Sequence, residues 1–136
     1  MITNWSDADD EMVALFKAAW DTTGFPCQYP NASWPDVGPK GPWAKLAIDY
    51  MFGRQYAFGG PGKGPFEKSG WVYINIYTPI GSGTKQGRDL MQIALKAFEG
   101  KHTPSDVWFR NVRMESEGRG TGGDRGFWVT IGVADF

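Results

Sequence analysis

A glycine-containing stretch, TPIGSGTKQGRDL at residues 78–90, holds the residue types most suggestive of chemistry. It follows a run that is typical of a β-strand and leads into a predicted helix. Gly81, Gly83 and Gly87 have the spacing G-x-G-x-x-x-G. Glycine-rich turns at such junctions bind phosphate, because the backbone N–H groups at the start of the helix point at the anion. Residues 81–87 are therefore a candidate nucleotide-binding loop.

The sequence around this turn departs from the known nucleotide-binding patterns. A dinucleotide site needs a tight strand-to-helix turn, but Pro79 and Ile80 separate the strand from Gly81. It also needs an acidic residue at the end of the next strand, where only Glu115 and Glu117 are available. The phosphate-loop pattern G-x-x-x-x-G-K followed by Ser or Thr is absent.

A structural interpretation of the turn remains open beside the nucleotide one. Gly81 and Gly83 would adopt positive φ angles that other residues avoid. Ser82 or Thr84 would then cap the following helix. On this interpretation the turn is a rigid connection between strand and helix, and the chain binds no cofactor.

Few other residues could form a catalytic site. Cys27 and His102 are the only residues of their types, which excludes an internal disulfide and a Cys-rich zinc site. The two could form a nucleophile pair, but a buried or half-exposed structural thiol is the simpler interpretation. Glu115 and Glu117 lie beside a predicted loop, where burial would not raise a carboxyl pKa for acid–base catalysis. We expect no catalytic residue, no metal site and no enzyme activity.

An aromatic strand face offers a second binding possibility. Trp71, Tyr73 and Tyr77 alternate along a predicted strand and could stack the bases of a single-stranded nucleic acid. No basic groove accompanies them, and the net charge of −1 with a pI near 5.8 argues against a dedicated nucleic-acid binder. Such a face also packs against helices or neighbouring subunits. The alternative function is therefore a small protein that binds nucleotides at 81–87 or single-stranded nucleic acid at 71–77.

Length and composition indicate one folded domain that spans residues 1–136. Hydrophobic residues make up 41% of the chain, with seven Trp and nine Phe, which is enough for a substantial core. No window approaches 18 apolar residues, so we expect no membrane span. Charge is uneven: residues 1–21 sum to −4 and the remainder to +3. The charged residues of the first part are Asp7, Asp9, Asp10, Glu11 and Asp21 against Lys17.

Two helices are predicted from apolar residues at helical spacing. The first covers about 7–22, with Ser6 as N-cap, and ends before Gly24 and Pro26. The second covers 85–99 and is stopped by Gly100. Its apolar stripe consists of Leu90, Met91, Ala94, Ala97 and Phe98.

Alternating patterns predict the strands. They cover 43–52, 71–77, 106–115 and 127–136, with a further short strand possible at 26–30 and a flexible loop at 116–126. In the strand at 71–77, Val72, Ile74 and Ile76 should face the core. In the strand at 127–136, Phe127, Val129, Ile131 and Val133 should face inward. Because the strands cluster in hairpin-like pairs, we predict an α+β fold, a mainly antiparallel sheet with two helices packed on one face.

The whole pattern resembles the tail terminator family of long-tailed bacteriophages, whose members are also called minor tail or tail completion proteins. The N-terminal helix followed by FPCQYPNASWP, the PWAKLAI strand and the terminal WVTIGVADF fit this family. The most specific part is GWVYINIYTPIGSGTKQGRDLMQIALKAFEG, which matches a strand, a T-P-x-G-x-G-like turn and a helix that closes on Phe98. The loop GRGTGGDRG is the part of the chain that we do not match to the family.

The resemblance implies a virion structural protein rather than an enzyme. Members form a six-fold homo-oligomeric ring at the capsid-proximal end of the tail tube, stop tube polymerisation, and join the tail to the head–tail connector. The expected partners are other copies of the chain, the major tail tube protein and the connector or neck protein. DNA passes through the lumen without sequence-specific binding. Such a protein is assembled in the host cytoplasm and ends in the virion tail.

On this resemblance the glycine turn is a rigid hinge, and the aromatic residues pack between subunits. The subunit-interface candidates are Trp34, Trp43, Trp71, Tyr73 and Tyr77. The candidates facing the lumen or DNA are Lys63, Arg119 and Arg125. The acidic start of the chain and its net basic remainder favour head-to-tail packing, which must close into a ring or else grow into filaments.

Overall fold

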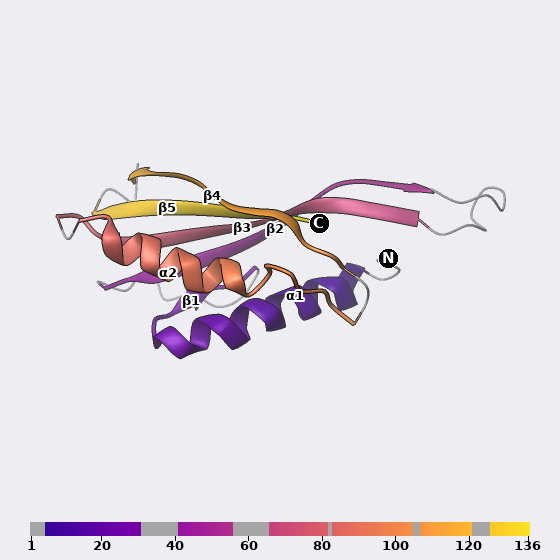
Figure 1. The fold of residues 1–136 in the computed structure, drawn as a ribbon, viewed down its shortest axis with the longest axis horizontal. Helices are drawn as coiled ribbons and strands as arrows, with labels where there is room; N and C mark the ends of the chain where they lie inside the picture. Colours follow the sequence, from indigo (N-terminus) through magenta and orange to yellow (C-terminus); the bar gives the residue numbers. More distant parts are fainter. Residues whose placement is uncertain (1–4, 31–40, 56–65, 82, 105–106, 121–125) are drawn as a thin grey trace.

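The chain folds as a five-stranded sheet with two helices on one side (Figure 1). The structure is a computed structural model, and it describes residues 5–30, 41–55, 66–81, 83–104, 107–120 and 126–136. The sheet order is β1-β2-β3-β5-β4, and all neighbours are antiparallel except β1 and β2. The α+β prediction is thus confirmed. The elements are α1 Trp5–Trp20, η1 Asp21–Thr23, β1 Cys27–Gln28, β2 Trp43–Gln55, β3 Phe66–Pro79, α2 Lys85–Lys96, β4 Arg110–Arg119 and β5 Phe127–Asp135.

The first helix, α1, buries one stripe of side chains against the sheet. Residues four apart share a helix face, and the fully buried ones are Ala8, Met12, Phe16 and Trp20. The helix begins at Trp5, so Ser6 lies inside it rather than at its N-cap. After the short η1 turn, Gly24 adopts a left-handed φ of 75°, and the indole Nε1 of Trp20 donates to the carbonyl of Phe25 at 2.9 Å.

The second helix, α2, packs beside α1 over β3 and β5. It ends earlier than predicted, at Lys96, and turn residues then lead to Gly100 with a φ of 70°. Phe98, just past the helix end, stacks on Phe16 with ring centroids 6.2 Å apart. This contact joins the two helices, so the aromatic that closes the helix pattern is a core residue.

The β2–β3 hairpin forms the centre of the sheet and continues beyond both helices (Figure 1). Its pairing runs from Trp43 opposite Tyr77 to Gln55 opposite Phe66. Val72, Ile74 and Ile76 have no exposed surface and face the helices, as predicted. Successive side chains of a strand point to opposite faces of the sheet, so Trp71, Tyr73, Asn75 and Tyr77 point away from the helices.

The predicted orientation of β5 is wrong. A Cβ on Gly132 would meet Met91 and Leu95 of α2, so Gly132 faces the helices. Thr130 and Ala134, two residues either side, share that face because side chains alternate along a strand. The four residues predicted to face inward lie on the opposite face. Both faces of β5 are rich in apolar residues, so periodicity alone could not choose between them.

The predicted loop at 116–126 is also partly wrong. β4 continues through Arg119 and pairs with β5 as far as Arg119 opposite Trp128, because a backbone hydrogen-bond ladder can hold residues of low strand propensity. Residues 121–125 lie outside the described part of the chain. The possible short strand at 26–30 is confirmed as β1, which pairs with Ala44 and Lys45.

Candidate functional site: the outward face of the sheet

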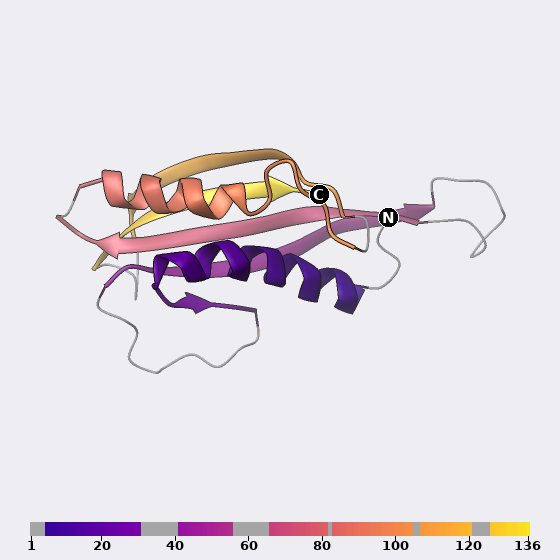
Figure 2. The same ribbon diagram turned by 60° about the horizontal axis from the view of Figure 1, so that its bottom comes forward.

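The face of the sheet that points away from the helices is the most distinctive surface of the molecule. We call it the outward face. The strand register places eight side chains of β3 and β5 there: Trp71, Tyr73, Asn75, Tyr77, Phe127, Val129, Ile131 and Val133. Figure 2 shows the helices gathered on the other side. An antiparallel sheet that faces water usually presents polar side chains there, whereas this face is mostly aromatic and aliphatic.

One end of the outward face is already packed within the chain. Trp43 of β2 stacks on Tyr77 with centroids 3.9 Å apart and planes within 7°. Phe127 meets both rings edge-on at 6.0 Å. Trp43 is 7% exposed and Tyr77 5%. These two predicted interface residues therefore form an internal aromatic cluster, which makes this end of the sheet rigid.

In the middle of the outward face Val133 is buried, but its apolar neighbours remain partly accessible. Trp71, Tyr73 and Ile131 are each half-buried, and the rings of Trp71 and Tyr73 lie 6.3 Å apart. No helix of the described chain covers them. Contiguous apolar surface of this kind is typical of protein–protein contacts, and aromatic residues are enriched at their centres.

A fixed polar rim borders the outward face at the start of β4. Asn111 has a positive φ of 51°, and the register shifts between Arg110 and Arg113, as in a β-bulge. Asp135 accepts hydrogen bonds from Asn111 and Arg113, both at 3.1 Å. An apolar centre with a polar rim is the usual anatomy of a protein interface.

The glycine turn lies at one end of the sheet and combines the predicted backbone geometry with an open pocket. Gly81 and Gly83 have φ angles of 90° and 85°, as the structural interpretation predicted. Thr84 is the N-cap of α2 but makes no side-chain capping hydrogen bond, and Ser82 lies outside the described residues.

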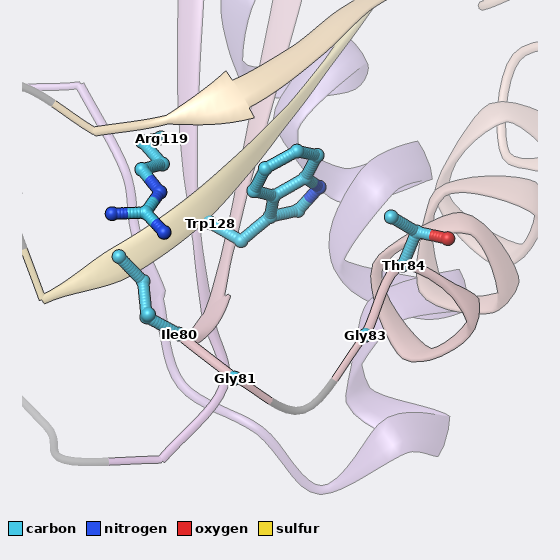
Figure 3. Close-up of a pocket in the computed structure, with 6 residues that line it drawn as sticks. All are labelled: Ile80, Gly81, Gly83, Thr84, Arg119 and Trp128. Carbon is cyan, nitrogen blue, oxygen red and sulfur yellow. The ribbon is translucent and has the colours of Figure 1, made fainter.

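A pocket of about 330 Å³ lies beside the glycine turn (Figure 3). Its lining is Ile80, Gly81, Gly83, Thr84, Arg119 and Trp128.

Gly87 has a packing role that explains its place inside a helix. A Cβ on Gly87 would lie 2.6 Å from the hydroxyl Oγ1 of Thr130, and Thr130 is fully buried in β5. The absent side chain lets α2 approach the sheet closely. The third glycine of the stretch therefore serves the contact between helix and sheet.

Replacing Gly87 with alanine should lower the free energy of unfolding by about 1–3 kcal/mol, because the new methyl group overpacks this contact. At an exposed helix position the same change would raise the free energy of unfolding by about 1 kcal/mol. Urea denaturation measures the free energy of unfolding of wild type and variant. The control is Gln92→Ala at an exposed position of the same helix. A stabilised Gly87→Ala protein would show that α2 does not approach Thr130 this closely.

Cys27 is a structural thiol. Its side chain is half-buried against the core cluster, and burial raises the pKa of the thiol from 9.0 to about 12. His102 stacks instead on Trp108, with centroids 4.3 Å apart. The structure thus gives His102 an aromatic partner and Cys27 a core environment, in line with the simpler interpretation.

The folded protein should react with a thiol reagent at pH 8 far more slowly than the protein in denaturant. A pKa raised from 9.0 to about 12 lowers the thiolate fraction roughly a thousandfold, and only the thiolate is nucleophilic. The thiol ionises at a lower pH in the unfolded protein than in the folded one. The free energy of unfolding should therefore fall as pH rises from 9 toward 12. Absorbance at 412 nm during labelling measures the rate, and equal rates in both states would contradict the burial of Cys27.

The remaining candidates are dispersed or lie outside the described residues. Glu117 accepts hydrogen bonds from Arg88 of α2, which lower the pKa of its carboxyl, while Glu115 is exposed. The lowered pKa of the Glu117 carboxyl is the opposite of what a general acid needs. The predicted site residues Trp34, Lys63 and Arg125 lie outside the described part of the chain. In that part, no group of three metal-ligating side chains occurs, and no helix has the length and apolar character to cross a bilayer.

Sequence reasoning missed two features of these surfaces. Val129 and Ile131 were assigned to the core, although they belong to the outward face. The pocket was missed because Arg119 was assigned to a loop, whereas β4 carries it beside Trp128. The apolar character of both faces of β5 is the signal that could have indicated an uncovered sheet face.

Comparison with known proteins identifies the fold alone. No protein-family model matches the chain, and no curated protein sequence matches it. A solved structure is similar to it with a TM-score of 0.58 and 18% sequence identity, over 93% of this chain and 92% of the other. The description of that structure names no function. At this identity the similarity supports the same α+β arrangement over almost the whole length, and nothing about partners.

Proposed function

We propose that this protein is a tail terminator of a long-tailed bacteriophage. It forms a closed ring at the capsid-proximal end of the tail tube, stops tube growth and joins the tail to the head–tail connector. The α+β fold with its T-P-I-G-S-G turn agrees with the family that the sequence resembles. A ring of six copies is the expected form, with DNA passing through its lumen.

The outward face is the observation that carries the proposal. Trp71, Tyr73 and Ile131 are half-buried on a sheet face that no helix of the described chain covers. A structural protein that works by contact needs such a surface, and neighbouring subunits at the tail end would bury it. The rigid Trp43–Tyr77 stack beside it keeps the flanking sheet in shape, which lowers the entropic cost of association.

The experiment that tests this proposal is the production of phage tails with and without the protein. Electron microscopy measures the tube lengths and the fraction of tails that are joined to capsids. Without the protein, we expect tubes longer than normal and no joined particles. With it supplied from a plasmid, normal length and joining should return. Tubes that stop at normal length in its absence would contradict the proposal.

A nucleotide-binding function is the second candidate, because the pocket beside the glycine turn contains an arginine. Arg119 and Trp128 could contact a phosphate and a base respectively. Thermal-shift titration with ATP, GTP and NAD separates the two candidates. The terminator proposal expects no shift. A micromolar affinity that is lost in Arg119→Ala would favour the nucleotide function instead.

A further inference from the structure

Two exposed charges of opposite sign lie on the outward face, both on strand β2. In the strand register Lys45 is opposite Asn75 of β3, and Asp49 is opposite Trp71. Directly opposite residues of antiparallel strands share a face of the sheet, so both charges lie on the same side as the aromatic residues. Both side chains are exposed, and within the described part of the chain neither forms an ion pair or a hydrogen bond. Four residues of strand separate the two charges by about 14 Å, so they cannot neutralise each other within one chain.

The adjacent strand β3 carries two polar groups in the same arrangement. Trp71 and Asn75 lie two residues before and two residues after Tyr73, and Tyr73 is the register partner of Ala47. An indole N–H can donate a hydrogen bond, and an amide oxygen can accept one. Among the described residues, neither of these two side chains has a hydrogen-bond partner. β3 therefore presents an unused donor and an unused acceptor at the same spacing as the two charges of β2.

A two-fold axis makes both arrangements complementary to themselves. The axis lies between two copies, across the strands and over the row formed by Ala47, Tyr73 and Val133. It turns one outward face onto the other, with the helices of both copies on the far sides (Figure 2). A residue two positions before this row then meets the residue two positions after it in the other copy. Lys45 of each copy thus meets Asp49 of the other, which is an isologous contact.

The other strands fit the same axis. On β3, the indole of Trp71 meets the amide of Asn75, and on β5 Ile131 meets Asp135. Asp135 already forms an ion pair with Arg113 at 3.1 Å, so neither of these two brings an uncompensated charge to the contact. Sheets that pack face to face lie about 10 Å apart, with side chains from both filling the gap. The four-carbon stem of a lysine lets its ammonium group reach a carboxylate across such a gap.

We propose that the free protein is a homodimer in which the outward faces of two copies pack on each other about this two-fold axis. The inference goes beyond the proposed ring, because it concerns the protein before assembly. A two-fold contact closes on itself, so it cannot be the contact that builds the ring. The dimer instead shields the apolar outward face from water until assembly takes the face over.

The size of the contact makes this dimer dissociable. Four strands about 4.8 Å apart and five residues of about 3.4 Å each give a footprint of about 19 Å by 17 Å around the axis. Stable interfaces bury about 800 Å² on each partner, well above this footprint. We therefore expect a dissociation constant in the micromolar range, which allows a larger contact at a tube end to displace the second copy.

Charge swaps test the axis. Lys45→Asp alone brings carboxylates together at both reciprocal contacts, and Asp49→Lys alone brings ammonium groups together. Each variant should be monomeric, with a dissociation constant raised at least about tenfold, because like charges meet. An equimolar mixture of the two should restore the dimer, since each copy then meets opposite charges, and so should the chain with both swaps. Sedimentation velocity at about 1–200 μM, a range around the expected dissociation constant, measures the dimer fraction, and thermal melting measures folding.

Carbodiimide cross-linking gives a second readout, because it joins an amine to a carboxylate only where the two are in contact. Lys45 and Asp49 lie about 14 Å apart in one chain, so a cross-link between them must join two copies. The control variant is Lys101→Asp, at an exposed position in the segment between α2 and β4, outside the sheet. It should leave both the dimer fraction and the cross-link unchanged.

The outcomes separate this inference from the proposed function. Wild-type protein that remains monomeric over the whole concentration range would overturn the dimer and leave the proposed ring untouched. A mixture that stays monomeric while both swap variants are folded, or a dimer that both single variants retain, would overturn the axis. If the swaps behave as expected but tubes stop at normal length without the protein, the proposed function fails and the dimer stands.

Discussion

Replacing Ile74 with alanine should lower the free energy of unfolding by about 2–5 kcal/mol, the range for deleting a buried aliphatic side chain without collapse of the site. Ile74 has no exposed surface. It lies in the middle of β3 between Leu46 of β2 and Gly132 of β5 in the register, and the helices cover it. Few atoms can move into the space that the substitution leaves, so the cavity should persist.

The matched control is Ile131→Ala, which removes the same atoms from the neighbouring strand on the outward face. Ile131 is half-buried, so less apolar surface returns to water and no closed cavity forms. Urea denaturation of the purified proteins measures both losses. A loss for Ile74→Ala below half that for Ile131→Ala would mean that the faces of the sheet are assigned the wrong way round.

Replacing Trp71 and Tyr73 together with serine should abolish tube capping while the subunit remains folded. The two rings form the accessible centre of the outward face, and buried aromatic residues contribute most of the binding energy in many interfaces. Loss of both should therefore cost more than any single rim contact. Tube length in electron micrographs measures capping, and circular dichroism with thermal melting measures folding.

Trp108→Ser is the control for a general effect of removing an aromatic residue. Trp108 is 59% exposed and lies in the segment between α2 and β4, so it is not one of the eight side chains of the outward face. Its replacement should leave tube length unchanged. If the Trp71 and Tyr73 double variant caps tubes normally, the outward face is not the surface that assembly buries. The uncovered face would then no longer support the proposed function.

The sequence predicted the elements well where one face alone is apolar. α1 and the core face of β3 follow single stripes of hydrophobic residues, so periodicity was enough. The assignment failed for β5, where apolar residues occupy both faces. Either face of this strand alone would fit a core, so the pattern could not choose between them.

The boundary of β4 could not be predicted because it depends on its neighbour. Residues 116–119 are polar or glycine and have low strand propensity, but β5 supplies hydrogen-bond partners along the whole edge. This extension places Arg119 in an edge strand, opposite Trp128. Sequence reasoning had placed the same residue in a loop facing the lumen.

The role of the glycine turn could be argued from the sequence only in part. Positive φ at Gly81 and Gly83 was expected from their type. The reason for Gly87 is a contact with Thr130, which lies more than forty residues away in the chain and cannot be recognised from local spacing. The pocket depends in the same way on Arg119 and Trp128 meeting the turn from two other strands.

Cryo-electron microscopy of the capsid-proximal end of finished tails tests the central claim most directly. The account predicts one closed ring of six copies of this fold above the last ring of the tube, with the outward face buried. Density for this fold that is absent from the capsid-proximal end, or present elsewhere in the virion, would contradict it.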